Sequence, residues 1–279
     1  MGKLQEAIFE QYASDCGRIF YRHVMGDGSD HIHYGLYTNE QTPIAEAVVA
    51  SSHALFSLCL KKIEPASIRS ILDLGAGAGG ATKCLLNWTD AAITCFDLSA
   101  PALKDLLKWA ESQGITHRLT IKVGSFDQYP ENWQRKFDVV WSQDAMCHSE
   151  DRKKLFTHVK QSLQPNGVFA FTDILLADNA TKEQIKAFSS VNALPNLGKE
   201  SAYIQNLKHA GFESVEVEDW TLHLKTNFKK MLHQIITGKQ WLLEHNIPEE
   251  LISKFAEALK QRIAWPDNSP MELKAFICK

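Results

Sequence analysis

The sequence predicts an α/β fold, doubly wound around a mainly parallel seven-stranded sheet with helical lid elements. Three observations predict it. Short apolar runs alternate with helical patterns between residues 70 and 172, as in βαβ units. A glycine-rich turn follows the first of these runs, where such folds bind ligands. Long helical segments flank the alternating region on both sides, so we divide the chain into an N-terminal helical cap with a substrate loop (1–66), a ligand-binding core (67–175) and a helical lid insertion with the closing strands of the same sheet (176–279).

The N-terminal part is predicted to be mostly helical. Apolar residues recur at near-helical spacing over residues 3–24, which indicates one or two helices. A glycine-rich break then leads into an aromatic, histidine-rich loop over residues 31–37. Thr42 is expected to cap a long helix over residues 44–63, with Pro43 in its first turn.

The remaining elements follow from changes between period-two and helical patterns. Strands are predicted over residues 71–74, 92–97, 119–123, 137–142, 168–172, 213–224 and 271–278. Helices are predicted over residues 81–87, 101–113, 152–163, 181–192, 199–210, 228–245 and 248–263. Pro165-Asn166-Gly167 predicts a turn before the fifth strand. The helical insertion is expected to lie over the carboxyl edge of the sheet.

Composition excludes several classes of function. The formal net charge of -3 leaves no basic excess, so nucleic acid is not expected as a partner. Six cysteines without Cys-x-x-Cys spacing fit a reduced intracellular protein and favour neither a zinc site nor a disulfide scaffold. Residues 1–10 contain no signal-peptide core, and the apolar runs are too short to span a membrane. We therefore expect a cytoplasmic monomer or homodimer that binds no metal, nucleic acid or membrane.

The turn after the first strand has the G-x-G-x-x-G pattern of dinucleotide sites, at Gly75, Gly77 and Gly80. Asp97 lies at the distance expected of a ribose-binding acid. Asp73 discriminates between ligands, because a carboxylate at the carboxyl end of the first strand would repel a pyrophosphate and attract an ammonium and a sulfonium. S-adenosylmethionine (SAM) carries both cations. Asp73 therefore favours SAM over a dinucleotide as the cofactor.

Polar and aromatic residues also follow the second and third strands. Asp97, with Leu98 beside it, can accept hydrogen bonds from both ribose hydroxyls. After the third strand, Gly124 lets the chain turn, Ser125 can read an adenine edge and Phe126 can cover a purine face. An ordinary loop aspartate and a core phenylalanine are the alternative interpretations.

The fourth strand ends where the reacting part of a cofactor would lie. Gln143 and Asp144 fall at this position, and His148 follows one turn later. His148 can act as a base or can simply begin the next helix. Thr172 and Asp173 end the fifth strand and are expected to line the acceptor side.

The chain resembles the SAM-dependent class I methyltransferases through blocks that occur in order over residues 30–175: Asp73-x-Gly75-x-Gly77-x-Gly79, Asp97, Gly124-Ser125-Phe126, Phe137 to Asp144, and Leu163-Gln164-Pro165-Asn166-Gly167. More narrowly, the chain is similar to the sarcosine/dimethylglycine N-methyltransferases, which make glycine betaine, through Asp30-x-Ile32-His33-x-Gly35-Leu36-Tyr37 and Trp141-Ser142-Gln143-Asp144-Ala145-x-x-His148-Ser149. Sterol, tocopherol and cyclopropane-type methyltransferases share the His-x-Gly before the helix.

The resemblance implies a Rossmann-like, SAM-binding core and a cofactor pose. In that pose Asp73 and Gly75 contact the methionine amino and carboxylate groups, and Gly77 and Gly79 lie in the same turn. Asp97 and Leu98 lie at the ribose, and Ser125 and Phe126 lie at the adenine. Gln143 lies near the methionyl part, and Tyr34 with Gly35 closes over the sulfonium methyl.

Methyl transfer from a sulfonium depends on alignment and a dry site, because the cofactor already carries the activation. We expect Tyr34 to close the site. If the acceptor is an amine, His148 or a water held by Asp144 is predicted to accept its proton.

A quaternary ammonium product would be stabilised by aromatic faces. Candidate aromatic residues are Tyr34, Tyr37 and Trp141, although Trp141 also fits the core. A glycine-derived acceptor further needs a cation for its carboxylate. The candidates are Arg22, Lys199 and Arg262, and the sequence does not select among them.

Other functions remain open at this point. An NAD-dependent dehydrogenase would need a catalytic Lys or Tyr pair, which the chain does not offer. A non-catalytic SAM-binding module is a further alternative. Within the methyltransferases, the rival is an O- or C-methyltransferase for a larger apolar metabolite. A buried Arg or Lys at the pocket would favour the amino acid, whereas an uncharged aromatic pocket would favour the rival.

Overall fold

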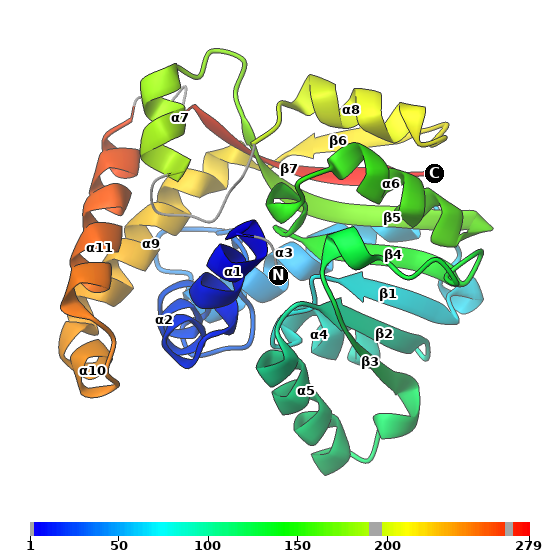
Figure 1. Ribbon diagram of the computed structural model, residues 1–279, viewed down its shortest axis with the longest axis horizontal. Coiled ribbons are helices and arrows are strands. Elements are labelled where there is room, and N and C mark those ends of the chain that lie inside the picture. The colour runs from blue at the N-terminus through cyan, green and yellow to red at the C-terminus, as the bar shows by residue number, and fades with distance from the viewer. Residues whose placement is uncertain (1–2, 190–196, 266–269) are drawn as a thin grey trace.

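A seven-stranded sheet organises the structure, a computed structural model that describes residues 3–189, 197–265 and 270–279 (Figure 1). The strands lie in the order β3-β2-β1-β4-β5-β7-β6. Their bounds are β1 Ser70–Leu74, β2 Ala92–Asp97, β3 Leu119–Val123, β4 Phe137–Gln143, β5 Leu163–Leu176, β6 Val215–Asp219 and β7 Met271–Cys278. Only β7 runs antiparallel to its neighbours, β5 and β6. The predicted α/β fold with a mainly parallel, seven-stranded sheet is confirmed.

Helices cover both faces of this sheet, as expected of a doubly wound fold. One face packs against α3 Ile44–Leu60, α4 Gly80–Trp88 and α5 Ala100–Ser112; the other packs against α6 Arg152–Ser162 and α8 Glu200–His209. Successive side chains of a strand point to opposite faces. Ile71 of β1 therefore joins the first apolar layer and its neighbour Leu72 joins the second.

The remaining helices gather beyond the carboxyl ends of the parallel strands (Figure 1). They are α1 Lys3–Ile8, α2 Asp15–Gly26, α7 Lys182–Ser189, α9 Leu224–Thr237, α10 Lys239–Glu244 and α11 Glu249–Ala264. A π-helix, Phe9–Ala13, joins α1 to α2, and short 3-10 helices occur at Pro65–Ser67, Thr116–Arg118, Phe126–Gln128, Met146–His148 and Thr221–His223. Phe20 of α2 meets Phe255 of α11 edge to face, with ring centroids 5.2 Å apart. Helices from both ends of the chain thus form one layer, and the three-part division of the chain stays a prediction.

No helix within the described ranges is long and apolar enough to cross a membrane.

Helix α3 begins differently from the expectation. Its N-cap is Pro43, and Thr42 does not cap the helix; the Thr42 hydroxyl instead pairs with the hydroxyl of Thr38 at 2.9 Å. The helix ends at Leu60, earlier than predicted.

The predicted strand over residues 213–224 is wrong beyond Asp219. The Thr221 N–H donates to the Asp219 carboxylate at 2.9 Å, which starts a 3-10 turn, and α9 begins at Leu224. The apolar spacing changes from two to three between Val217 and Trp220, so a period-two strand does not continue there.

Two other predicted boundaries also move. The helix over residues 228–245 is two helices that meet at Gly238, where a Cβ atom would lie 2.1 Å from His23 Nε2. Residues 164–167 form an irregularity inside β5, because the pairing with β4 shifts between Phe137 and Val139. Residues 190–192 of the helix predicted over 181–192 lie outside the described residues.

Phe276→Ala should lower the free energy of unfolding by about 3–5 kcal/mol, because it opens a cavity in a fully buried layer. The Phe276 ring stacks on Phe171 with centroids 4.6 Å apart. Urea unfolding measures the change. Leu222→Ala, at a side chain that is 76% exposed, is the control and should change stability by less than about 0.5 kcal/mol. A similar small loss in Phe276→Ala would contradict the packing described.

Candidate active site

A cavity of about 300 Å³ lies at the carboxyl ends of the parallel strands. Residues that follow β1, β2, β3 and β4 line one side, and α1, α2, α9 and α11 contribute to the other. Among the lining residues are these sequence-predicted ones: Tyr34, Gly75, Gly77, Asp97, Leu98, Ser125, Phe126, Gln143, Asp144 and His148. The fold therefore brings most of the predicted site residues together around one cavity.

The glycines of the turn after β1 have different structural roles. Gly75, Gly77 and Gly79 all have positive φ angles, which favour glycine. Gly77 lines the cavity, and a Cβ atom there would meet no described atom within 4 Å. A Cβ atom on Gly79 would lie 2.5 Å from Leu106 Cδ1. Gly79 is thus required by packing against α5, and it is not among the described residues that line the cavity.

Asp73 is a buried carboxylate behind the glycine turn. Its carboxylate is 2% exposed, accepts a 2.5 Å hydrogen bond from the Thr82 hydroxyl, and does not belong to the lining of the cavity as far as the structure describes it. Burial raises the pKa of Asp73 to about 7. The hydrogen bond directs this oxygen of Asp73 toward α4, and the expected contact of Asp73 with the cofactor stays a prediction.

Asp97 is the carboxylate that reaches the cavity at this edge. One of its oxygens accepts the Gly77 N–H at 2.8 Å and the other accepts the Ser99 N–H at 2.7 Å. Burial raises the pKa of Asp97, while these backbone donors lower it. Each carboxylate oxygen keeps a second lone pair, which a pair of vicinal hydroxyls can use.

Gln143 is the last residue of β4, and the structure shows a hydrogen bond to only one of the two polar atoms of its amide. Its Oε1 accepts a 2.8 Å hydrogen bond from Ser52 of α3. Its Nε2 is buried at the cavity wall and has no hydrogen-bond partner among the described residues. A buried, unpaired donor is costly, so this atom is a candidate contact for a polar ligand group.

Asp144 joins the loop of residues 31–37 to the strand ends. Its carboxylate accepts the Tyr34 N–H and the Thr172 hydroxyl, both at 2.7 Å. The backbone of Asp144 has φ 51°, a strained conformation for a residue other than glycine. Burial raises the pKa of this carboxyl to about 6. Both oxygens are engaged by the protein, which favours a positioning role.

His148 lies at the cavity beside Tyr12, whose spacing in the sequence predicts only an apolar helix face. The ring of Tyr12 meets the His148 imidazole edge to face, with centroids 5.2 Å apart. Tyr12 belongs to the π-helix Phe9–Ala13, a rare element that often marks functional sites. No local pattern marks Tyr12, because its spacing with Leu4 and Ile8 equals that of an ordinary buried helix face.

Of the three aromatic residues proposed for a cationic product, Tyr34 alone belongs to the described cavity lining. The Tyr37 hydroxyl donates to Asn227 at 3.3 Å, and Trp141 is fully buried in the core. Asn227 also exchanges two 2.9 Å hydrogen bonds with the backbone of Gly35. The loop is thereby clamped to α9 with Tyr34 directed to the cavity.

The structure separates the three candidate cations. Arg22 lines the cavity mouth and pairs with Asp30 at 3.3 Å, while Lys199 pairs with Asp178 in an exposed position. Arg262 of α11 is 4% exposed, and its guanidinium lies 5.6 Å from the centroid of the Phe228 ring.

Three tyrosines that line the cavity interact electrostatically with the guanidinium of Arg262. Burial lowers the pKa of Arg262, whereas the phenols of Tyr34, Tyr21 and Tyr12 raise it. The rings of Tyr12 and Tyr21 lie 4.7 Å apart, and the Tyr34 ring meets Phe228 edge to face. Arg262 thus lies in an aromatic layer directly behind the cavity wall.

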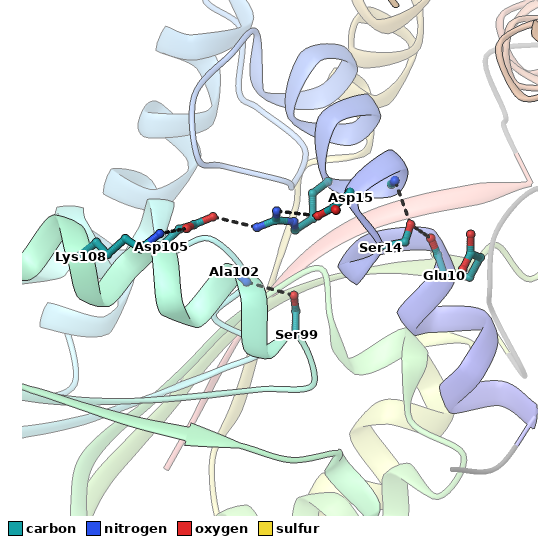
Figure 2. A network of polar contacts seen from close by, with 9 residues as sticks. Glu10, Ser14, Asp15, Ser99, Ala102, Asp105 and Lys108 are labelled. Atoms are coloured by element: carbon teal, nitrogen blue, oxygen red, sulfur yellow. Dashed lines mark hydrogen bonds and ion pairs between the residues drawn. The ribbon is translucent and has the colours of Figure 1, made fainter. Parts of the chain in front are cut away.

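Polar contacts hold the N-terminal helices over the cavity. Figure 2 shows Asp15, Asp105 and Lys108 in one network, through which Arg18 of α2 pairs with Asp105 of α5 at 2.8 Å. From α1, Gln5 donates to the carboxylate of Asp127 at 2.9 Å. In the described part of the chain, no three His, Cys, Asp or Glu side chains form a group that could hold a metal ion.

Comparisons with known proteins agree with this geometry. Residues 71–167 match the family described as Methyltransferase domain. The chain is 32% identical over 241 residues to a glycine/sarcosine/dimethylglycine N-methyltransferase of Actinopolyspora halophila, which covers 86% of this chain and 41% of that longer relative. It is 28% identical to a sarcosine/dimethylglycine N-methyltransferase of Halorhodospira halochloris, over 91% of this chain and 88% of the relative.

A solved structure resembles nearly the whole chain. A Galdieria sulphuraria protein, provisionally named a sarcosine dimethylglycine methyltransferase, superposes with a TM-score of 0.86 and 26% identity, over 96% of this chain and 97% of that one. The fold, the cavity at the strand ends and these similarities lead to one conclusion. The chain is a SAM-dependent methyltransferase with the class I fold.

Proposed function

We propose that this methyltransferase moves the methyl group of SAM to the amine of sarcosine or dimethylglycine. The observation that carries the proposal is the buried guanidinium of Arg262 behind a wall of cavity-lining tyrosines. Such a combination suits a small zwitterion. The names of the relatives from Actinopolyspora halophila and Halorhodospira halochloris support the same acceptor class.

The cavity fits the cofactor at three points. Asp97 presents carboxylate lone pairs for ribose hydroxyls, and Gly77 leaves open space beside them. The unpaired Gln143 Nε2 offers a buried donor for the methionyl part. SAM, when bound, supplies an activated methyl group. Leu98, Ser125 and Phe126 line the cavity and would enclose the nucleoside.

Asp73 and Gly79 make structural contacts behind the glycine turn. We propose that they shape the glycine turn from behind, through the Thr82 hydroxyl and the Leu106 side chain respectively. Gly75 and Gly77 remain the glycines that approach the cofactor.

On the acceptor side, the chain supplies aromatic faces and one buried cation. Tyr12, Tyr21 and Tyr34 can stabilise a methylated ammonium by cation–π attraction, worth about 0.5–2 kcal/mol for each face. Arg262 is not among the described residues that line the cavity, so it would act on the acceptor carboxylate through the layer of these tyrosines. A larger apolar acceptor would leave this buried charge unused, which favours the amino acid over the O- or C-methyltransferase alternative.

His148 is the proposed proton acceptor. It lines the cavity beside Tyr12, and a neutral imidazole can take the proton of a protonated amine before attack. Asp144 accepts one hydrogen bond on each oxygen, from Tyr34 and Thr172, and each oxygen keeps a second lone pair with which it could hold a water as an alternative proton acceptor. We propose that Asp144 positions the loop that carries Tyr34.

An acceptor panel tests the proposal. Sarcosine and dimethylglycine should be methylated, whereas N,N-dimethylpropylamine, phenols and isoprenoid acceptors should react far more slowly. Arg262→Gln should raise the KM for dimethylglycine by about 10-fold or more, because the positive charge behind the tyrosines is lost, with the KM for SAM unchanged. Methyl transfer to another class in the absence of transfer to glycine derivatives would overturn the acceptor assignment.

Asp97→Ala should weaken SAM binding by at least about 10-fold, since it removes charge-assisted hydrogen bonds to the ribose. Isothermal titration calorimetry with SAM measures this directly. Asp90→Ala, an exposed aspartate outside the cavity lining as described, is the matched control. Full SAM affinity in Asp97→Ala would exclude the ribose role.

The two glycine positions should respond differently to alanine. Gly77→Ala should lower SAM affinity, because its methyl group enters open space at the cavity, and should lower stability only by the roughly 1 kcal/mol that a positive φ costs alanine. Gly79→Ala should mainly lower stability, by about 1–3 kcal/mol, since its methyl group overlaps Leu106. Thermal unfolding and SAM titration of both variants separate the effects, and the reverse ranking would refute this division of roles.

A further inference from the structure

Two buried histidines lie directly before Tyr34 and have no part in the chemistry proposed above. His31 is 6% exposed and His33 is 5% exposed. Their rings meet edge to face, and His31 Nδ1 lies 2.9 Å from His33 Nε2. Paired buried imidazoles must share protons in an ordered way, because each neutral ring has one donor and one acceptor.

The neighbouring atoms define the direction of these hydrogen bonds. His33 Nδ1 lies 3.2 Å from the carbonyl oxygen of Tyr34, which can only accept, and 3.2 Å from the Ser51 hydroxyl. Because the Ser51 hydroxyl donates its hydrogen to the Val48 carbonyl at 3.0 Å, we place the hydrogen of His33 on Nδ1. His33 Nε2 must then accept from Nδ1–H of His31. His31 Nε2 is left as an acceptor, and the Cys84 thiol lies 3.9 Å from it. The relay therefore runs from Cys84 through His31 and His33 to the loop backbone.

Both rings are neutral in this arrangement. Burial is the main reason that the pKa of His31 falls to about 3 and that of His33 to about 4. Around His31, the Asp30 carboxylate raises the pKa, whereas His33 and Lys83 lower it. A proton on His33 Nε2 would place two donors against each other across 2.9 Å, whereas a proton on His31 would enter at Nε2, which is buried beside the Cys84 thiol.

Ser52 lies between His33 and the cofactor side of the cavity, and its single hydrogen goes to Gln143. The Ser52 hydroxyl lies 3.4 Å from His33 Nε2 and 2.8 Å from Gln143 Oε1. Since Oε1 is held by Ser52, Nε2 of the same amide is left at the cavity wall. Ser52 thus determines which end of the Gln143 amide a ligand meets.

The relay also packs against the glycine turn. Gly80 begins α4, and a Cβ atom there would lie 2.6 Å from His31 Cγ and 2.8 Å from the Asp30 backbone. The last glycine of the G-x-G-x-x-G pattern is therefore required by the histidine loop. The cofactor turn and the loop of residues 31–37 are in direct contact at this point.

We infer that His31 and His33 are positioning residues, whose one-way hydrogen-bond relay holds the loop of residues 31–37 and, with Ser52, orients the Gln143 amide for the cofactor. The last step rests on the proposed role of Gln143. The relay itself depends only on the contacts of the loop.

Nitrogen-15 NMR of the full-length protein tests the relay without any activity measurement. Both imidazoles should be neutral Nδ1–H tautomers near pH 7 and remain so at about pH 5, where a free histidine is mostly protonated. Signals are assigned with His31→Gln and His33→Gln. An Nε2–H tautomer or an imidazolium at either position would overturn the relay.

Ser52 variants test the connection to the cofactor. Ser52→Ala should raise the Kd and KM for SAM by about 10-fold with kcat within about twofold, and Ser52→Thr should restore binding because it keeps the hydroxyl. Ser57→Ala, at an exposed serine of the same helix, is the control. Unchanged SAM affinity in Ser52→Ala would refute the orientation of Gln143. Calorimetry needs no acceptor, so a failure of the glycine-derivative assignment remains distinguishable from a failure of this inference.

Discussion

The hydrogen bonds of the Asp144 carboxylate hold together the parts of the chain that make the active site. They join the end of β4 to Thr172 of β5 and to the backbone of Tyr34, which lies far away in the sequence. Asp144 adopts a left-handed backbone conformation, which costs a non-glycine residue on the order of 1 kcal/mol or more. The surrounding contacts over-determine this conformation. Strain is thus located where the N-terminal loop meets the sheet, and it turns the carboxylate toward that loop.

Hydrogen bonds within the protein orient the polar groups of the cavity. Asp97 holds the glycine turn through Gly77, and Gln143 is oriented by Ser52, so their remaining hydrogen-bonding capacity has a defined direction. Within the described residues, Gln143 Nε2 and Ser149 Oγ are buried without partners at the cavity wall. Burying an unpaired polar atom is unfavourable, so a ligand that forms hydrogen bonds with these atoms offsets the free-energy cost of their burial.

The groups proposed for the cofactor and those proposed to recognise the acceptor come from different regions of the chain. The residues 71–167 that match the methyltransferase family contain the glycine turn, Asp97 and Gln143. The groups proposed to recognise the acceptor lie outside this range, on the π-helix with Tyr12, on α2 with Tyr21 and on α11 with Arg262. This separation explains in physical terms how one cofactor fold can serve many acceptors, because the cap can change while the strand ends stay the same.

The sequence by itself determined the order of strands and helices, the glycine turn after β1 and the polar residues at the strand ends, because periodicity and turn chemistry report local backbone geometry. Only the tertiary structure decided that Asp97 reaches the cavity while Asp73 is turned to Thr82, and that Arg262 is the buried cation among three candidates. Likewise, Tyr12 has the spacing of a core residue, and only the packing of the cap brings it to His148. Burial and side-chain direction depend on helices distant in sequence, so no local pattern could reveal them.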